Sequence, residues 1–145
     1  VDHLTGAFVQ NAMFLKPDGY FCLNVFTRPS LRELVMAFEN SRRARQGNGF
    51  TGIRRLPLPR DVIDAVKRAG FRLRTQRQRE LRVYFDDMMD LLRWVKGIGA
   101  QAAPRDFYVG KDLLSEAESY YRTRFSEDRR IYTTFGVVTV IAQQD

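Results

Sequence analysis

The sequence contains a single cysteine and a single histidine among its 145 residues. One cysteine, Cys22, excludes an internal disulfide framework and suits a reducing compartment, so we expect a cytoplasmic protein. A His/Cys metal site and a Ser-His-Asp arrangement are also excluded. We expect His3 to be exposed and Cys22 to be a small core residue inside a strand. These absences remove several classes of hydrolase and metalloenzyme.

Long hydrophobic runs are also missing. No apolar run approaches the ~20 residues that span a bilayer, and residues 1–20 lack the order of a signal peptide. The sequence has no internal repeat and no low-complexity linker. We therefore expect no membrane partner and a single domain over residues 1–145. The first residue is Val rather than Met, and we expect the natural start to lie upstream.

Basic residues are concentrated in the middle of the chain. Residues 42–82 hold 13 of the 24 Lys and Arg but only three of the 17 Asp and Glu. Twenty of the 24 basic residues are Arg, whose forked guanidinium group suits carboxylate and phosphate. An acidic protein, nucleic acid or plain solvent could face such a surface. Few aromatic residues interleave with the Arg, and no nucleic-acid-binding motif is present, which argues against nucleic acid.

Hydrophobic periodicity predicts helices alternating with strands, which is an α/β fold. The strand 20–26 is apolar on both faces, as expected inside such a sheet, and the last strand has the pattern of a buried central strand. Three acids at 86, 87 and 90 indicate helix capping rather than a metal site. We expect helices over 4–14, 30–45, 60–70, 88–99 and 112–125, and strands over 20–26, 71–85 and 129–143.

Local signals also predict how these elements begin and end. Ser30 and Glu33 have the spacing of a capping box, and Asp112 is expected to cap the last helix. Gly70 is expected to end the helix before the second strand. In that strand Arg72, Arg74 and Arg82 share one parity, whereas Arg77 and Arg79 have the other. A bulge near 75–76, or an exposed sheet edge guarded by charge, would reconcile this pattern.

Several segments together resemble one family. "LKPDGYFCLNVF" (15–26), "TRPSLRELVMAF" (27–38), "DVIDAVKRAGF" (61–71), "VYFDDMMDLLRWVKGIGAQ" (83–101) and "IYTTFGVVTVIAQ" (131–143) occur in this order. The chain resembles the C-terminal half of a class I S-adenosylmethionine-dependent methyltransferase. It is similar in particular to the malonyl-carrier-protein O-methyltransferases of biotin synthesis (the BioC family) and to their relatives that assist respiratory complex I assembly. The resemblance runs from about Leu4 to Gln143.

The resemblance implies a mixed sheet with flanking helices, the C-terminal part of a Rossmann-like fold. Its strands five to seven would carry an inserted helical substrate lid at about 76–125. It further implies S-adenosylmethionine as cofactor and a small acid, the malonyl group of acyl carrier protein, as acceptor. The G-x-G-x-G loop of the family is absent. We therefore expect the cofactor motifs upstream of residue 1 and the chain alone to be an incomplete enzyme.

The resemblance also suggests which residues bind. Tyr84, Phe85 and Trp94 are candidates for the small-molecule substrate pocket. Six Arg near a glycine-rich loop are candidates for contact with the strongly acidic carrier protein: Arg42, Arg43, Arg45, Arg54, Arg55 and Arg60. No cofactor-binding, metal-binding or catalytic residue is assigned. A non-catalytic basic module that binds an acidic protein is the alternative function. A homo-oligomer could cover the open sheet edge.

Overall fold

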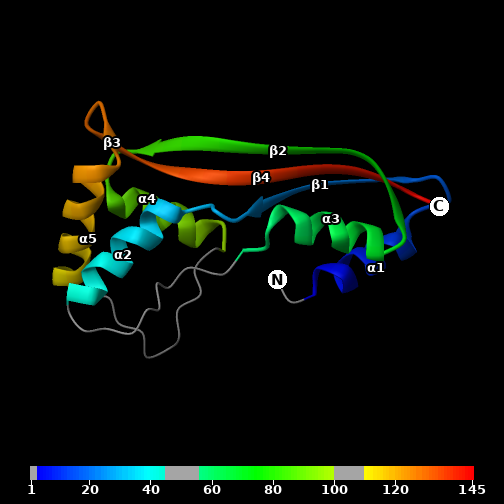
Figure 1. The fold of residues 1–145 in the computed structure, drawn as a ribbon, viewed down its shortest axis with the longest axis horizontal. Helices are drawn as coiled ribbons and strands as arrows, with labels where there is room; N and C mark the ends of the chain where they lie inside the picture. The colour runs from blue at the N-terminus through cyan, green and yellow to red at the C-terminus, as the bar shows by residue number, and fades with distance from the viewer. Residues whose placement is uncertain (1–2, 45–55, 100–109) are drawn as a thin grey trace. The chain divides into compact units, whose positions relative to one another are not determined.

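The computed structural model describes residues 3–44, 56–99 and 110–145, and helices alternate with strands through them (Figure 1). The elements are α1 (Leu4–Phe14), β1 (Tyr20–Thr27), α2 (Arg32–Ala44), α3 (Pro59–Arg68), β2 (Phe71–Phe85), α4 (Met88–Gly97), α5 (Lys111–Arg124), β3 (Ser126–Glu127) and β4 (Arg130–Gln144). The predicted α/β class, a sheet with flanking helices, is confirmed. No helix in the described ranges is long and apolar enough to cross a membrane.

The three long strands have the order β1-β4-β2, and the short β3 pairs with β4. The last strand is therefore central, as its apolar sequence predicts. β1 and β4 are antiparallel, with Tyr20 opposite Gln143 and Thr27 opposite Gly136.

The chain forms two compact units. Unit 1 comprises Val1–Ser30, Arg55–Leu81 and Phe135–Asp145, and unit 2 comprises Leu31–Arg54 and Arg82–Thr134. The predicted single-domain organisation stays a prediction. The segment expected as a helical lid, 76–125, begins within β2, so that its helical part consists of α4 and α5.

The core of unit 1 lies between the sheet and the helices α1 and α3, which cover one sheet face (Figure 1). Val62 and Val66 of α3 are fully buried against it, together with Val138 and Val140 of β4. Phe21 of β1 joins this core and partly covers Phe8 and Phe71. Alternate residues of β1 and β4 thus face the helices, as a strand period of two requires.

Unit 2 is built around the packing of α2 on α5. Leu34 of α2 is fully buried, as are Ala117 and Tyr121 of α5. These residues lie on the apolar stripes that the sequence predicts at helical spacing. Leu91 of α4 is fully buried as well.

The expectation that β1 is covered on both faces is wrong. Its residues alternate between exposed and partly buried until the buried Thr27. Cys22, expected in the core, is exposed because it lies on the face opposite α1 and α3. β1 also lies at one end of the strand order. Tyr20 and Phe26, on the same face, are 57% and 38% exposed.

The predicted capping box at Ser30 and Glu33 is also wrong. Ser30 donates its hydroxyl to the carbonyl oxygen of Thr27 (2.6 Å) and accepts from the Gly136 amide (2.8 Å). The Glu33 carboxylate, 2% exposed, accepts hydrogen bonds from β4. Ser30 and Glu33 both bond backbone amides of β4, whereas in a capping box each side chain bonds the backbone amide of the other residue. Tertiary contacts therefore override the local motif.

The other helix ends are mixed in outcome. Asp87 caps α4 as expected, because its Oδ1 accepts from the Asp90 amide at 2.9 Å. Gly70 follows α3 at a φ of 92°, which suits glycine and confirms its predicted role. Asp112 is wrong as a cap: the capping position of α5 is Gly110, and Asp112 lies in the first turn.

Candidate functional site: a cavity at the end of β1

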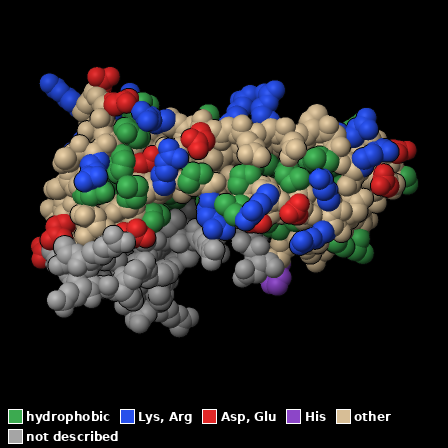
Figure 2. All heavy atoms as spheres, viewed as in Figure 1, with side chains coloured by type: hydrophobic (Ala, Val, Ile, Leu, Met, Phe, Trp, Pro, Cys, Tyr) green, Lys and Arg blue, Asp and Glu red, His purple; other side chains and the backbone are tan. Residues whose placement is uncertain are grey.

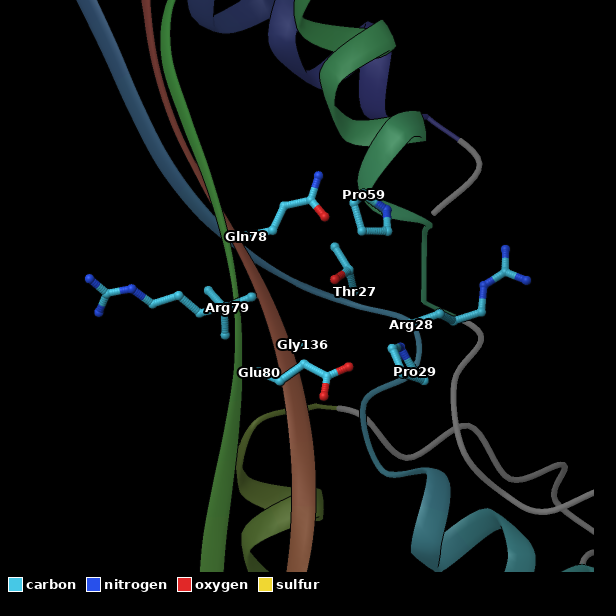
Figure 3. A pocket seen from close by; sticks show the side chains of 9 residues that line it. Thr27, Arg28, Pro29, Pro59, Gln78, Arg79, Glu80 and Gly136 are labelled. Carbon is cyan, nitrogen blue, oxygen red and sulfur yellow. The ribbon is translucent and has the colours of Figure 1, made fainter.

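A cavity of about 170 Å³ lies in unit 1, where β1 ends and α3 begins (Figure 3). Four segments that are distant in sequence meet there. The lining residues are Thr27, Arg28, Pro29, Pro59, Gln78, Arg79, Glu80, Gly136 and Val137. In α/β proteins the carboxyl ends of strands are where ligands bind, so this position suits a functional site.

The β2 side chains at the cavity point in two directions (Figure 3). Gln78 extends toward Pro59 and Glu80 extends toward Pro29, whereas Arg79 points away on the opposite side of the strand. Thr27 lies between β1 and these groups. The cavity therefore presents a hydroxyl, an amide and a carboxylate to a guest.

Arg28 is fixed at the rim by the segment that leads into α3. Its Nε donates to the carbonyl oxygen of Leu56 at 2.7 Å, and its backbone amide donates to that of Pro57 at 2.9 Å. Both bonds hold the turn after β1 against the start of α3. The guanidinium group is consequently positioned by the fold.

Gly136 allows the two strands to approach closely at the cavity. A Cβ atom at this position would lie 3.1 Å from both the carbonyl oxygen and the hydroxyl oxygen of Thr27. The Gly136 amide and carbonyl also bond Ser30, at 2.8 and 3.1 Å. A side chain at Gly136 would have to displace Thr27.

The predicted substrate residues lie in unit 2 and not at this cavity. Tyr84 and Phe85 are neighbours on β2, so their side chains leave opposite faces of the strand. Phe85 meets Trp94 edge-to-face with ring centroids 6.1 Å apart. Tyr84 meets Tyr132 in the same way at 6.0 Å. The structure thus brings Phe85 and Trp94 together and separates Tyr84 from them.

Tyr84 belongs to a charged and aromatic cluster. Its hydroxyl donates to Oε2 of Glu127 at 2.7 Å, and Arg82 donates to Oε1 of the same carboxylate at 2.8 Å. The Arg82 guanidinium carbon also lies 3.9 Å from the centroid of the Tyr132 ring. The hydrogen bond to Glu127 raises the pKa of Tyr84, because ionisation would place two negative charges together.

The predicted carrier-protein residues are only partly described. Arg42 and Arg43 are in the last turns of α2. Arg45, Arg54 and Arg55 lie outside the described residues. Arg60 is exposed in the first turn of α3, directly after Pro59 of the cavity. Their role in binding stays a prediction.

Sequence reasoning missed the cavity residues. Thr27 ends β1, and Arg28 and Pro29 directly follow it, so their position was a usable signal. Gln78 and Glu80 gave no such signal. They are distant from Thr27 in the sequence, and only the strand order β1-β4-β2 brings them close to it. Among the described residues no group of His, Cys, Asp or Glu could hold a metal ion.

Comparison with known proteins places the chain among methyltransferase relatives, although no family profile matches it. It is 28% identical over 138 residues to the malonyl-[acyl-carrier protein] O-methyltransferase of Methylovorus, covering 93% of this chain and 44% of that protein. It is also 28% identical over 144 residues to the mitochondrial arginine-hydroxylase NDUFAF5 of Mus musculus, covering 97% and 42%. The chain spans less than half the length of these relatives.

The fold leads in the same direction. A solved structure from Bacillus halodurans, described as a methyltransferase, superposes with a TM-score of 0.53 at 13% identity. The superposition covers 98% of this chain and 65% of that one. Sequence and fold together relate this chain to the class I S-adenosylmethionine-dependent methyltransferases.

Proposed function

We propose that this chain forms the acceptor-side part of an S-adenosylmethionine-dependent methyltransferase whose substrate is the malonyl carboxylate on acyl carrier protein. The observation that carries the proposal is the alignment with the Methylovorus enzyme, which extends over 93% of the chain. The segment "LLRWVKGIGAQ" (91–101), which resembles a fairly specific family motif, supports it.

The cofactor does not fit the described residues. Rossmann-like cofactor sites use a glycine-rich turn after a strand and an acidic residue after a second one. β1 is instead followed by Arg28 and Pro29. The cavity of about 170 Å³ is also smaller than the roughly 300–1,000 Å³ of typical cofactor sites. We therefore propose that the cofactor is bound by residues other than these 145, and that this chain binds the acceptor.

In this proposal two sets of residues have different tasks. Phe85 and Trp94, which already contact each other, contribute apolar surface for the malonyl-bearing arm, with Tyr84 on the other face of β2. Arg60 and the basic residues before α3 attract the acidic carrier protein. The free carboxylate of the substrate is held by an Arg in a bidentate pair.

Calorimetric titration with carrier proteins tests the proposal. Malonyl-carrier protein should bind more tightly than the same protein bearing the malonyl methyl ester, by about tenfold, because the ester lacks the charge that pairs with Arg. Unloaded carrier protein is the matched control. Equal affinity for all three would contradict recognition of the malonyl carboxylate. Failure to bind any of them would remove the carrier protein as partner.

A second candidate substrate is an arginine side chain. The mitochondrial relatives named arginine-hydroxylase are as similar to this chain as the methyltransferase. At the cavity Thr27, Gln78 and Glu80 offer oxygen acceptors, which suit a guanidinium donor. The same calorimetry with an arginine peptide and its citrulline analogue tests this candidate. Preference for arginine, with no binding of malonyl-carrier protein, would favour it.

A third candidate, the non-catalytic basic module, makes a different prediction. Acidic carrier protein would bind with the same affinity regardless of what it carries. The concentration of basic residues in 42–82 favours this candidate. Tighter binding of malonyl-carrier protein than of unloaded carrier protein would exclude it.

A further inference from the structure

The middle of β2 is the most exposed part of the sheet. All nine residues over 74–82 are exposed, so both strand faces meet solvent there. β2 ends the strand order β1-β4-β2, and no strand in the described part of the chain pairs with its outer edge. Backbone donors and acceptors on that edge are therefore open to a partner.

The arginine side chains of β2 lie on one face. Phe71 and Leu73 pack on the core beneath α1 and α3, so Arg72 and Arg74 point away from these helices. Farther along, Gln78 points toward Pro59 of α3 and Arg79 points to the opposite side (Figure 3). The helix-facing residues thus change from odd to even numbers between 73 and 78.

A β-bulge between 73 and 78 would produce this change, and the bulge near 75–76 stays a prediction. Because of the change, Arg72, Arg74, Arg77 and Arg79 share the face opposite α1 and α3. Basic side chains project in Figure 2 at the edge where the middle of β2 runs.

Three of these four arginines are available. Arg72 donates to Gln143 at 3.1 Å and lies 3.8 Å from the Asp145 carboxylate. Within the described ranges Arg74, Arg77 and Arg79 form no ion pair. Two of them are spaced by two residues, which is the spacing of side chains on one face of a strand.

We propose that the outer edge of β2 over 75–81 binds an extended acidic segment of a protein partner, which adds to the sheet as a strand. Main-chain hydrogen bonds along the edge provide the docking mode. Acidic residues at alternate positions of the added strand face Arg77 and Arg79 as cross-strand pairs. A second copy of this chain is a poorer occupant. Pairing of its β2 with this β2 would place arginines opposite arginines, and like charges in cross-strand positions repel.

The test uses a fluorescein-labelled nine-residue peptide of alternating Glu and Thr with blocked ends. Fluorescence anisotropy should report binding that Arg77→Gln with Arg79→Gln weakens by roughly tenfold, the weight of two exposed ion pairs. Lys67→Gln with Arg68→Gln removes the same charge from exposed positions of α3 and should change affinity less than about twofold. Equal weakening by both pairs would overturn the proposal.

Two further measurements separate strand addition from general attraction. Hydrogen exchange of the amides over 75–81 should slow when the peptide binds, because an added strand accepts from the outward N–H groups. Binding without this protection would overturn the proposal. A peptide with its Glu in one block, and single-stranded DNA of equal charge, should bind more weakly. Tighter binding of the DNA would assign the surface to nucleic acid instead.

Discussion

At the scale of single residues, Glu33 of unit 2 is a buried carboxylate that accepts several hydrogen bonds from β4. It accepts from the Thr134 amide at 2.9 Å, from the Thr133 hydroxyl at 3.2 Å and from the Thr134 hydroxyl. The adjacent Leu31 amide donates to the Thr134 carbonyl at 2.8 Å. These bonds fix the start of α2 on β4, and they explain why a carboxylate is tolerated at 2% exposure.

Replacement of Glu33 should therefore be costly. Glu33→Ala is expected to lower the free energy of unfolding by about 3 kcal/mol, because it leaves the donors of Thr133 and Thr134 unsatisfied. Glu39→Ala, on the same helix but only half-buried, should cost less than about 0.5 kcal/mol. Urea denaturation measures both. Equal effects of the two substitutions would show that the Glu33 hydrogen bonds add no stability.

Gly136 allows β1 and β4 to approach each other closely beside the cavity. Gly136→Ala should lower the free energy of unfolding by about 1–2 kcal/mol, since its Cβ would press on Thr27. Gly6→Ala is the matched control: nothing lies within 4 Å of its added Cβ. In the helix α1 this change should stabilise by up to about 1 kcal/mol. Thermal unfolding of the two variants should therefore shift in opposite directions.

Tyr84 should make stability depend on alkaline pH. Its pKa is raised in the folded protein, first by the hydrogen bond to Glu127. A raised pKa contributes stability that is present below the ordinary value of about 10 and is lost as pH rises through the folded value. The stability difference between the wild type and Tyr84→Phe should consequently shrink above about pH 10. Glu127→Gln should abolish this pH dependence, and its persistence in that variant would contradict the assigned cause.

At the scale of secondary-structure elements, most of the fold follows from local pattern. The stripes of α2, α3 and α5, the Asp87 cap and the apolar β4 are all legible in the sequence. The failures come from tertiary competition. Glu33 bonds β4 rather than its own helix start, and Cys22 lies on a sheet face that the described residues leave uncovered.

The candidate site was much less predictable than the fold. The cavity depends on Gln78 pointing toward Pro59 and Glu80 toward Pro29, which a strict alternation from Phe71 would not give. Which face holds the arginines depends on where α1 and α3 pack. Strand order, rather than any motif, brings Thr27 and Gly136 together with β2.

The start of α4 offers an element-scale test. Asp87→Ala removes the acceptor for the Asp90 amide and should lower the free energy of unfolding by about 1 kcal/mol. Asp86→Ala, one residue earlier and exposed, should have an effect below about 0.5 kcal/mol. Chemical denaturation distinguishes them. Equal losses would mean that first-turn charge, rather than the capping hydrogen bond, stabilises α4.

At the scale of the whole molecule, the chain has a methyltransferase-related fold without a recognisable cofactor site in its described residues. The two relatives compared above are more than twice as long. The malonyl-[acyl-carrier protein] O-methyltransferase and the arginine-hydroxylase are each 28% identical to this chain. We propose different partners for the two basic regions: the carrier protein for Arg60 and the basic residues before α3, and an extended acidic segment for the β2 edge. We propose that the cofactor and the acceptor are bound by different parts of the protein.

Calorimetric titration of the folded 145-residue chain with S-adenosylhomocysteine tests that claim most directly. The account predicts no measurable heat of binding, while malonyl-carrier protein titrated into the same preparation binds. Circular dichroism of the sample before titration verifies that the chain is folded. Binding of S-adenosylhomocysteine at micromolar strength, with one site per chain, would contradict the account and place the cofactor within these residues.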